Sequence, residues 1–262
     1  PRVDMISFTG STATGTRIMT AAAATIKKVF LELGGKSALV ALDDADIDAV
    51  VTSAAFATTT HAGQGCANTT RLLLPRNKYR DGVAALAETL KTWPYGDPTD
   101  SSVLMGPLIR EEQRQRVLGY IRKGVEEGAT ITVGGGIPAH LSTGYYVEPT
   151  VLADVDPDST VAQDEIFGPV LVVIPHDGDD HAVEIANNSR YGLSGTVVSA
   201  SDERVRAVAN RMRTGTVNVN GGVFYGVDVP FGGYKQSGIG REMGVAGFEE
   251  YLETKSIAEG AR

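Results

Sequence analysis

The sequence predicts an α/β protein whose core is a largely parallel open sheet. Short runs rich in β-branched residues alternate with amphipathic stretches, the pattern of strands joined by helices. The chain has 262 residues, enough for one large α/β domain or for one and a half smaller ones. Its 42% hydrophobic and 21% charged residues are ordinary for a globular protein, so we expect a sizeable core.

Apolar runs and helix-capping residues place the elements of the first half of the chain. Asp43 or Asp44 is expected to cap a helix that ends at Gly63. Asp46 and Asp48 then lie in its first turn, where the helix dipole favours acids. The expected elements, in order, are an apolar segment over 5–8, a helix over 12–26, strands over 28–33 and 38–42, the capped helix, a strand over 70–75, a helix over 78–93 and a charged helix over 110–128.

The second half begins with a stretch dominated by turn residues, from 134 to 144. After it, we expect strands over 170–174, 195–199 and 216–220, and helices over 181–188 and 203–214. We find no repeat, linker or low-complexity tract. The alternation of elements therefore continues to the last quarter of the chain.

Charge and cysteine content narrow the class of partner. The net charge of −8 has no basic stripe, which argues against nucleic acid and anionic membranes and favours a small molecule. No apolar run approaches the roughly 18 residues of a membrane span. The single cysteine forms no internal disulfide and fits a reducing compartment, so we expect a cytoplasmic protein. The four histidines are scattered without metal-ligand spacing, so no metal site is expected.

A glycine-bearing turn precedes the first helix. Gly10 and Gly15 have the spacing of a phosphate-binding loop, but Thr16 and Arg17 stand where that loop needs Lys and Ser or Thr. The helix that begins after Gly10 offers free backbone N–H groups to an anion, and Ser11 adds a hydroxyl. The alternative is an ordinary strand-to-helix turn.

Two residues have the surroundings of reactive groups. Cys66 follows Gly63 and Gly65 on a backbone without bulky cover, so the thiol is expected to be accessible. Because it follows the end of a helix, the helix dipole disfavours its thiolate. Glu32 interrupts an apolar strand just before two glycines, and burial would raise its pKa into the range of a general base. The alternative for Glu32 is a polar residue on the wet face of the strand.

Five short motifs occur in the order and approximate spacing found in one enzyme family. They are FTGS at 8–11, LELGGK at 31–36, GQGC at 63–66, EIFGP at 165–169 and PFGGYKQSG at 230–238. In these motifs the chain resembles the NAD(P)-dependent aldehyde dehydrogenase superfamily. The resemblance runs from about residue 8 to residue 257, but it covers only the C-terminal half or so of a family member. It implies NAD or NADP as cofactor, an aldehyde as substrate and the catalytic-domain fold of the family.

The resemblance implies catalytic roles for two residues. Cys66 matches the nucleophile that attacks the aldehyde carbon, giving a thiohemiacetal and, after hydride transfer to the nicotinamide, a thioester. Glu32 matches the base that activates water to hydrolyse that thioester. The backbone N–H of Cys66 can form one arm of an oxyanion hole. The other arm, an asparagine in the family, lies N-terminal of anything in this sequence.

Cofactor residues are implied in the same way. Glu165 matches the carboxylate that holds the nicotinamide ribose hydroxyls, and Phe167 matches the aromatic residue near the nicotinamide ring. Ser11, after Gly10, matches the contact to the pyrophosphate. For Glu165 the alternative is a solvated loop acid.

The family lines its aldehyde entrance with aromatic residues. Phe231, together with Phe224 or Tyr225, lies in the corresponding segment, with ordinary core packing as the alternative. Lys36 and Lys235 also lie within motifs, and we interpret them as structural or surface lysines.

The resemblance divides the chain into three parts. Residues 1–34 are expected to be a remnant of the cofactor-binding domain, 35–234 the catalytic domain, and 235–262 a return to the cofactor domain followed by an oligomerisation strand. Residues 251–258 alternate in a way that suits such a strand, so we expect a homo-oligomer, a dimer or a tetramer. Because the chain supplies only part of the cofactor site and one oxyanion donor, we expect it to be inactive alone.

Two other functions stay open at this point. A CoA-acylating semialdehyde dehydrogenase would pass the acyl group to CoA, but that branch tends to lack the glutamate found here at Glu32. A non-catalytic fragment could keep the fold as a binding or assembly module.

Overall fold

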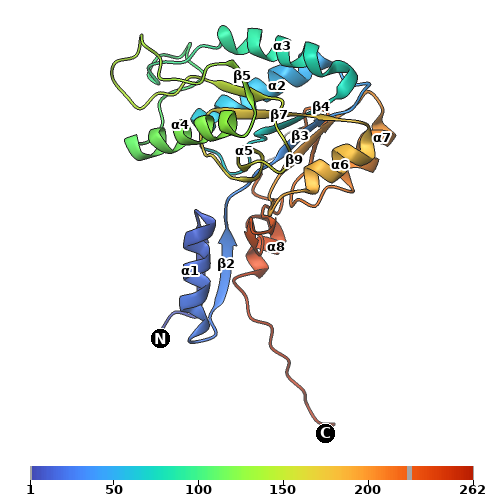
Figure 1. The fold of residues 1–262 in the computed structure, drawn as a ribbon. Helices are drawn as coiled ribbons and strands as arrows, with labels where there is room; N and C mark the ends of the chain where they lie inside the picture. The colour runs from blue at the N-terminus through green and yellow to red at the C-terminus, as the bar shows by residue number, and fades with distance from the viewer. Residues whose placement is uncertain (1, 223–225, 262) are drawn as a thin grey trace.

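The main body of the protein is built around one open sheet of seven strands (Figure 1). This computed structural model describes residues 2–222 and 226–261. The strands, from one edge to the other, are β10 (Asn218–Val219), β9 (Gly195–Val198), β3 (Ala38–Ala41), β4 (Arg71–Pro75), β7 (Val170–His176), β6 (Thr150–Ala153) and β5 (Thr130–Val133). All neighbours are parallel except β5 and β6. The predicted α/β class with a largely parallel open sheet is confirmed.

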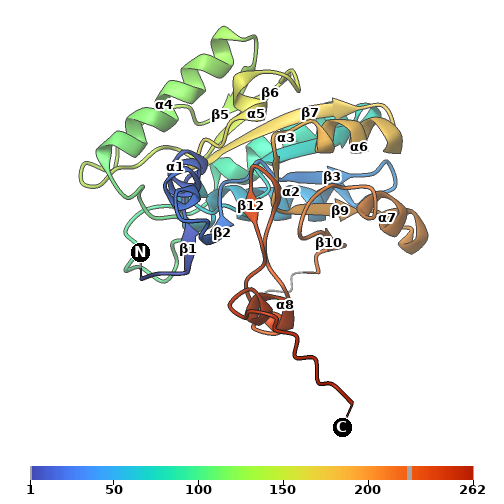
Figure 2. The same ribbon diagram turned by 90° about the horizontal axis from the view of Figure 1, so that it is seen from below.

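Helices cover both faces of this sheet (Figures 1 and 2). One face carries α2 (Ile47–Thr59) and α3 (Tyr79–Lys91), and the other carries α4 (Glu111–Glu126), α5 (Thr160–Gln163), α6 (Asp179–Asn187) and α7 (Asp202–Ala209). Alternate residues of β3 supply the two cores, because Leu39 packs with the first group and Val40 with the second. Both faces are therefore apolar, as in other parallel sheets.

Two of the differences from the sequence-based expectations concern the cap of α2 and the edge of the main sheet. Asp46, not Asp43 or Asp44, caps α2, and its side chain accepts hydrogen bonds from the backbone N–H of Asp48 and Ala49. Asp43 and Asp44, which follow β3, instead form ion pairs with Arg204 of α7. The strands β5 and β6 were not expected, because each has only four residues and flanks a turn-rich stretch.

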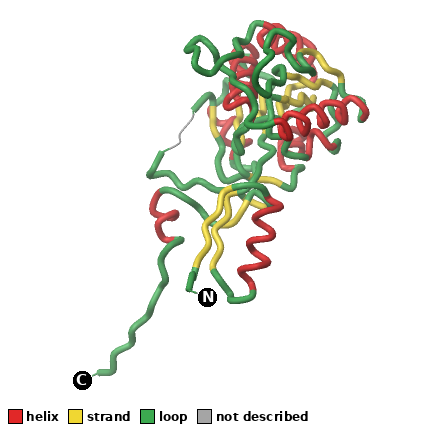
Figure 3. Tube along the Cα trace, turned by 90° about the vertical axis from the view of Figure 1, so that its left-hand side faces the viewer, coloured by secondary structure: helices red, strands yellow, loops and turns green. Residues whose placement is uncertain are grey.

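A smaller sheet forms a second layer of structure beside the main body (Figure 3). Its strands are β1 (Met5–Thr9), β2 (Lys28–Glu32) and β12 (Gly238–Ile239), and α1 (Thr12–Ala23) connects the first two. Antiparallel pairing of β12 with β2 places Gly238 opposite Glu32. A Cβ at Gly238 would lie 1.9 Å from the carbonyl oxygen of Leu31, so only glycine fits. Residues far apart in the chain thus meet at Glu32.

The remaining elements are short. They are η1 (Thr60–Gly63) and η2 (Arg76–Lys78), which are 3₁₀ helices, the strands β8 (Tyr191–Gly192) and β11 (Tyr234–Lys235), which pair with each other, and α8 (Gly244–Glu249).

Beyond α8 the chain leaves the body as an exposed tail (Figures 1–3). Residues 252–261 pair with no strand of the described chain, so the expected oligomerisation strand at 251–258 stays a prediction that a second copy would test. Within the described ranges, no helix combines the length and apolarity that a membrane crossing needs.

Candidate active site

Glu32 ends β2 with its carboxylate buried. Only 1% of the residue is exposed, and neither carboxylate oxygen has a hydrogen-bond partner among the described residues. Burial, followed by the nearby charge of Glu242, raises the pKa of Glu32 to about 7. The alternative of a solvated face is wrong, and the carboxyl group has the pKa of a base that works near neutral pH.

Two glycines after Glu32 allow two other groups to approach the backbone closely. A Cβ at Gly34 would lie 2.2 Å from Glu165 Oε2, and a Cβ at Gly35 would lie 2.4 Å from the carbonyl oxygen of Cys66. The backbone N–H of Gly35 donates a 3.1 Å hydrogen bond to Glu165 Oε1. The bare backbone of 34–35 therefore joins the segments of Glu32, Cys66 and Glu165.

A left-handed turn delivers Cys66 to this junction. After α2, His61 and Ala62 have φ of 51° and 55°, and Gly63 has φ of 72°. Side chains are disfavoured in this region, and a Cβ at Gly63 would lie 2.0 Å from the carbonyl oxygen of Gly168. The turn is thus held by its packing against the loop that follows Phe167.

The thiol itself is half-buried, less open than the sequence predicts. Burial raises the pKa of Cys66, and the charges of Glu32 and Glu165 raise it further. The expected direction of the shift stands, but burial rather than the end of a helix is its first cause. At neutral pH the thiol is therefore mostly protonated, and only its small thiolate fraction is reactive.

The first turn of α1 also reaches this place. Ser11 caps the helix, and its Oγ accepts a 3.3 Å hydrogen bond from the backbone N–H of Thr14. The backbone N–H of Gly10 donates to the carbonyl oxygen of Glu32 at 2.9 Å. The positive end of the α1 dipole therefore lies next to the end of β2.

These groups line one cavity of about 720 Å³. Six residues singled out from the sequence contribute to it: Gly10, Ser11, Glu32, Cys66, Glu165 and Phe167. Phe231 is not among its described lining residues; its backbone pairs in both directions with Glu242, at 2.8 and 2.7 Å. Phe224 and Tyr225 lie outside the described residues. The substrate role of these three aromatics stays a prediction.

Other lining residues were missed at the sequence level. They are chiefly polar or charged: Gln64, Arg110, Gln113, Arg116, Arg190 and Tyr191. The cluster of arginines within 110–116 was a usable signal, but a charged helix is usually a solvated one. Gln64 also connects the turn that carries Cys66 to the segment before α4, since its Oε1 accepts from the N–H of Ile109 at 3.1 Å.

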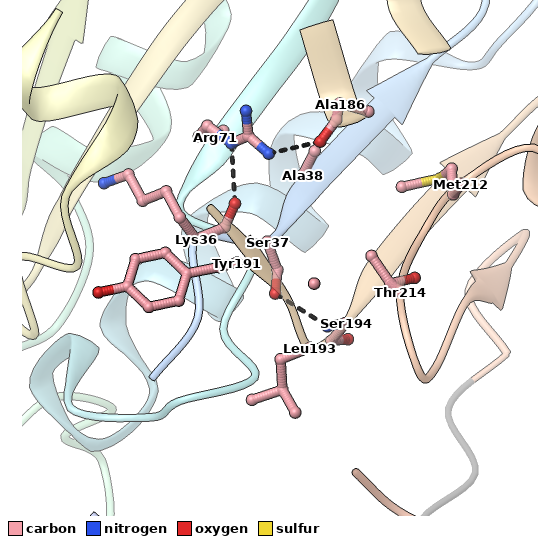
Figure 4. Close-up of a pocket in the computed structure, with 11 residues that line it drawn as sticks. Lys36, Ser37, Ala38, Arg71, Ala186, Tyr191, Leu193, Ser194, Met212 and Thr214 are labelled. Carbon is pink, nitrogen blue, oxygen red and sulfur yellow. Dashed lines mark hydrogen bonds between the residues drawn. The ribbon is translucent and has the colours of Figure 1, made fainter. Parts of the chain in front are cut away.

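Two buried cations lie behind the junction, around a small pocket (Figure 4). The Arg71 guanidinium donates to the carbonyl oxygens of Lys36 and Ala186, each at 2.8 Å, and to that of Ile185 at 2.9 Å. Lys36 is only 2% exposed, so burial excludes the surface alternative and leaves that of a structural lysine. Burial, and then the charge of Arg71, lower the pKa of Lys36 to about 7. Lys235 is exposed and donates to the carbonyl oxygens of Asn187 and Ser189.

Comparison with known proteins decides the family. The profile described as "Aldehyde dehydrogenase family" matches residues 1–257. The chain belongs to this family. An aldehyde dehydrogenase relative, named putative, from Staphylococcus haemolyticus is 46% identical over 259 residues, covering 98% of this chain and 54% of its own length. The 3-succinoylsemialdehyde-pyridine dehydrogenase of a Pseudomonas species is 48% identical with the same coverage.

Solved aldehyde dehydrogenases share the fold. A crystal structure of the Mycobacterium tuberculosis aldehyde dehydrogenase complexed with NAD+ matches with a TM-score of 0.92 and 47% identity, over 94% of this chain and 51% of that one. A mutant of aldehyde dehydrogenase C from Pseudomonas syringae, complexed with NAD+ and octanal, matches with a TM-score of 0.94 and 44% identity, over 97% and 53%. This aldehyde dehydrogenase chain thus spans about half the length of the relatives it matches.

Proposed function

We propose that an aldehyde dehydrogenase carrying this chain oxidises an aldehyde to a carboxylic acid with NAD, through a thioester on Cys66. One observation carries the proposal: a thiol, a carboxyl group with a pKa of about 7 and the Glu165 carboxylate line the same cavity. The thiol is the strongest nucleophile type available, and the carboxyl group supplies a base that works near neutral pH.

The residues of this chain act in a defined order. The Cys66 thiol loses its proton to solvent, its sulfur bonds to the aldehyde carbon, and the carbonyl oxygen becomes an oxyanion to which the Cys66 backbone N–H donates. Bound NAD would supply the hydride acceptor, and loss of a hydride from that carbon leaves an acyl group on the sulfur. Glu32 then takes a proton from water as the water oxygen attacks the acyl carbon. The carbon–sulfur bond breaks, the acid leaves and Cys66 is regenerated as a thiolate.

The described residues suit the cofactor at three points. The N-terminus of α1, with Ser11, offers N–H groups and a positive dipole end to the pyrophosphate. The Glu165 carboxylate offers acceptors to the nicotinamide ribose hydroxyls, and Phe167, 38% exposed, offers an aromatic face. The NAD+ complexes of the Mycobacterium and Pseudomonas proteins support NAD rather than NADP.

The proposed division of labour within the chain is the one expected from the sequence. Residues 1–34 and 235–262 would serve the cofactor side, since β12 pairs with β2, and 35–234 would carry the chemistry. Phe231, Phe224 and Tyr225 would line the aldehyde entrance. The tail would add a strand to a second copy in a dimer or tetramer, and the cytoplasm is the proposed location.

Two alternatives make different demands on the site. A CoA-acylating enzyme needs no base for water, so the buried Glu32 favours hydrolysis over transfer to CoA. A non-catalytic binding module would not need a thiol and a base in one cavity.

The test is Cys66→Ala in a full-length aldehyde dehydrogenase that carries this chain. NADH formation, followed by absorbance with a panel of aldehydes, should fall by at least about 10⁴-fold, because no other nucleophile replaces the thiol. Carboxylic acid should form in the parent without added CoA. Retained turnover in the variant would rule out the mechanism, and a requirement for CoA would favour the acylating alternative.

A further inference from the structure

Residues 164–167, the loop that carries Glu165 and Phe167, are held by one helix, two of whose residues, Gln113 and Arg116, also line the cavity. Gln113, Arg116 and Tyr120 recur on α4 at intervals of three and four residues, so they lie on one face of it. All three donate hydrogen bonds to this loop.

The first two contacts are to the backbone of the loop. Gln113 Nε2 donates to the carbonyl oxygens of Ile166 at 3.1 Å and of Phe167 at 2.6 Å. Arg116 Nη2 donates to the carbonyl oxygen of Glu165 at 2.8 Å. Phe167 has a φ of 60°, which an aromatic residue adopts only when its surroundings hold it there. The α4 contacts supply part of that support.

The third contact is to a side chain. Tyr120 Oη donates to Asp164 Oδ2 at 3.0 Å and accepts from Arg116 Nη2 at 3.1 Å. The other oxygen of Asp164 pairs with Arg190, which precedes β8. Burial raises the pKa of Tyr120, so its hydroxyl stays protonated and remains a donor. Asp164, the neighbour of Glu165, is therefore held between α4 and the segment before β8.

Nearby positive charges also favour the ionised form of the Glu165 carboxylate. Burial raises its pKa, while the Gly35 N–H bond and then the positive charges of Lys36 and Arg116 oppose that rise. The carboxylate lies on Gly34 and Gly35, with no space for a Cβ at Gly34. Its position is thus set by contact with Gly34 and Gly35 and by the hydrogen bonds from α4 to the loop that carries it.

We propose that this face of α4 positions the Glu165 carboxylate for the cofactor ribose, and that Tyr120 is a positioning residue acting through Asp164. The inference rests on the proposed function, because it requires Glu165 to bind that ribose. Tyr120 does not line the cavity, but it contacts two residues that do, Asp164 and Arg116. A double variant separates a path through Asp164 and Glu165 from one through Arg116.

The test compares Tyr120→Phe, Glu165→Gln and the double variant in a full-length aldehyde dehydrogenase carrying this chain. Tyr120→Phe removes one hydrogen bond and should weaken the Kd for NAD, measured by titration calorimetry, by about fivefold. The KM for aldehyde should not change. In the Glu165→Gln background the same substitution should change the Kd by less than about twofold, because the group it positions is gone.

Tyr146→Phe is the matched control. The Tyr146 hydroxyl is buried and donates to the carbonyl oxygen of Gly96 at 2.7 Å, away from the cavity. Its loss should lower stability without changing the Kd for NAD. Amide hydrogen exchange of residues 164–167, measured in the 262-residue chain, should accelerate in Tyr120→Phe and not in Tyr146→Phe.

The outcomes separate the two proposals. If Glu165→Gln weakens NAD binding and Tyr120→Phe does not, the positioning role is overturned and the proposed function stands. An equal loss from Tyr120→Phe in both backgrounds also overturns the role, since the effect would not pass through Glu165. If Glu165→Gln binds NAD as the parent does, the proposed ribose contact is itself wrong, and the inference falls with it.

Discussion

The two carboxylates of the cavity are held in opposite ways. Glu32 is buried with no hydrogen-bond partner for either oxygen among the described residues, and its pKa rises to about 7. Glu165 accepts a backbone hydrogen bond, lies near two cations and belongs to a loop that α4 clamps. Burial raises the pKa of the first to near neutral, whereas a hydrogen bond and nearby charges hold the second in place. The same residue type thus serves chemistry or geometry according to what surrounds it.

The largest expected effect comes from removing the base. Glu32→Gln in the full-length enzyme should slow steady-state turnover by about 10²- to 10⁴-fold, because water loses its proton acceptor. Rapid mixing should still show a burst of NADH, since acyl-enzyme formation does not consume water. Glu203→Gln, at an exposed glutamate of α7, is the control that should leave both phases unchanged. Loss of the burst in a folded variant would contradict the role given to Glu32.

A smaller effect, of about 3 kcal/mol, is expected on stability. The pKa of Glu32 is about 7 in the folded chain against 4.5 as its ordinary value, so between these values the folded state binds more protons than the unfolded state. The contribution of Glu32 to the unfolding free energy should therefore be fully present below pH 4.5, fall as pH rises and be lost above pH 7, by about 3 kcal/mol in all.

The matching measurement is denaturant unfolding of this chain and of Glu32→Gln across that pH range. The difference between the two isolates the one carboxyl group from all others that titrate. A difference that does not vary with pH would mean that Glu32 ionises normally in the folded chain.

The smallest expected effect concerns the fixed carboxylate. Gly34→Ala would place a Cβ 2.2 Å from Glu165 Oε2, so the carboxylate must move away from residue 34. Loss of one or two hydrogen bonds to a charged group should weaken NAD binding by about 10- to 100-fold. Gly119→Ala in α4 is the control, because its Cβ would meet only Arg122 Nη2 at 3.9 Å. An unchanged Kd for NAD in Gly34→Ala would show that Glu165 is not fixed by the bare backbone.

The sequence by itself determined the class of fold and singled out the residues proposed to carry the chemistry. Strand and helix periodicity reflects local geometry, so most elements were predicted within a few residues. Cys66 and Glu32 stood out because each interrupts its local pattern next to glycine. Periodicity and adjacent glycines are local features, so they can be recognised from neighbouring residues in the sequence.

Only the tertiary structure decided how these residues meet. The Gly35 to Glu165 hydrogen bond joins positions 130 residues apart, and β12 returns to pair with Glu32 from the far end of the chain. The burial of Cys66 and Lys36 and the clamp of Tyr120 on Asp164 depend on the same long-range packing. Sequence spacing reports what lies within a turn or a strand, whereas desolvation and hydrogen-bond partners are set by segments that meet only when the sheet and its helices assemble.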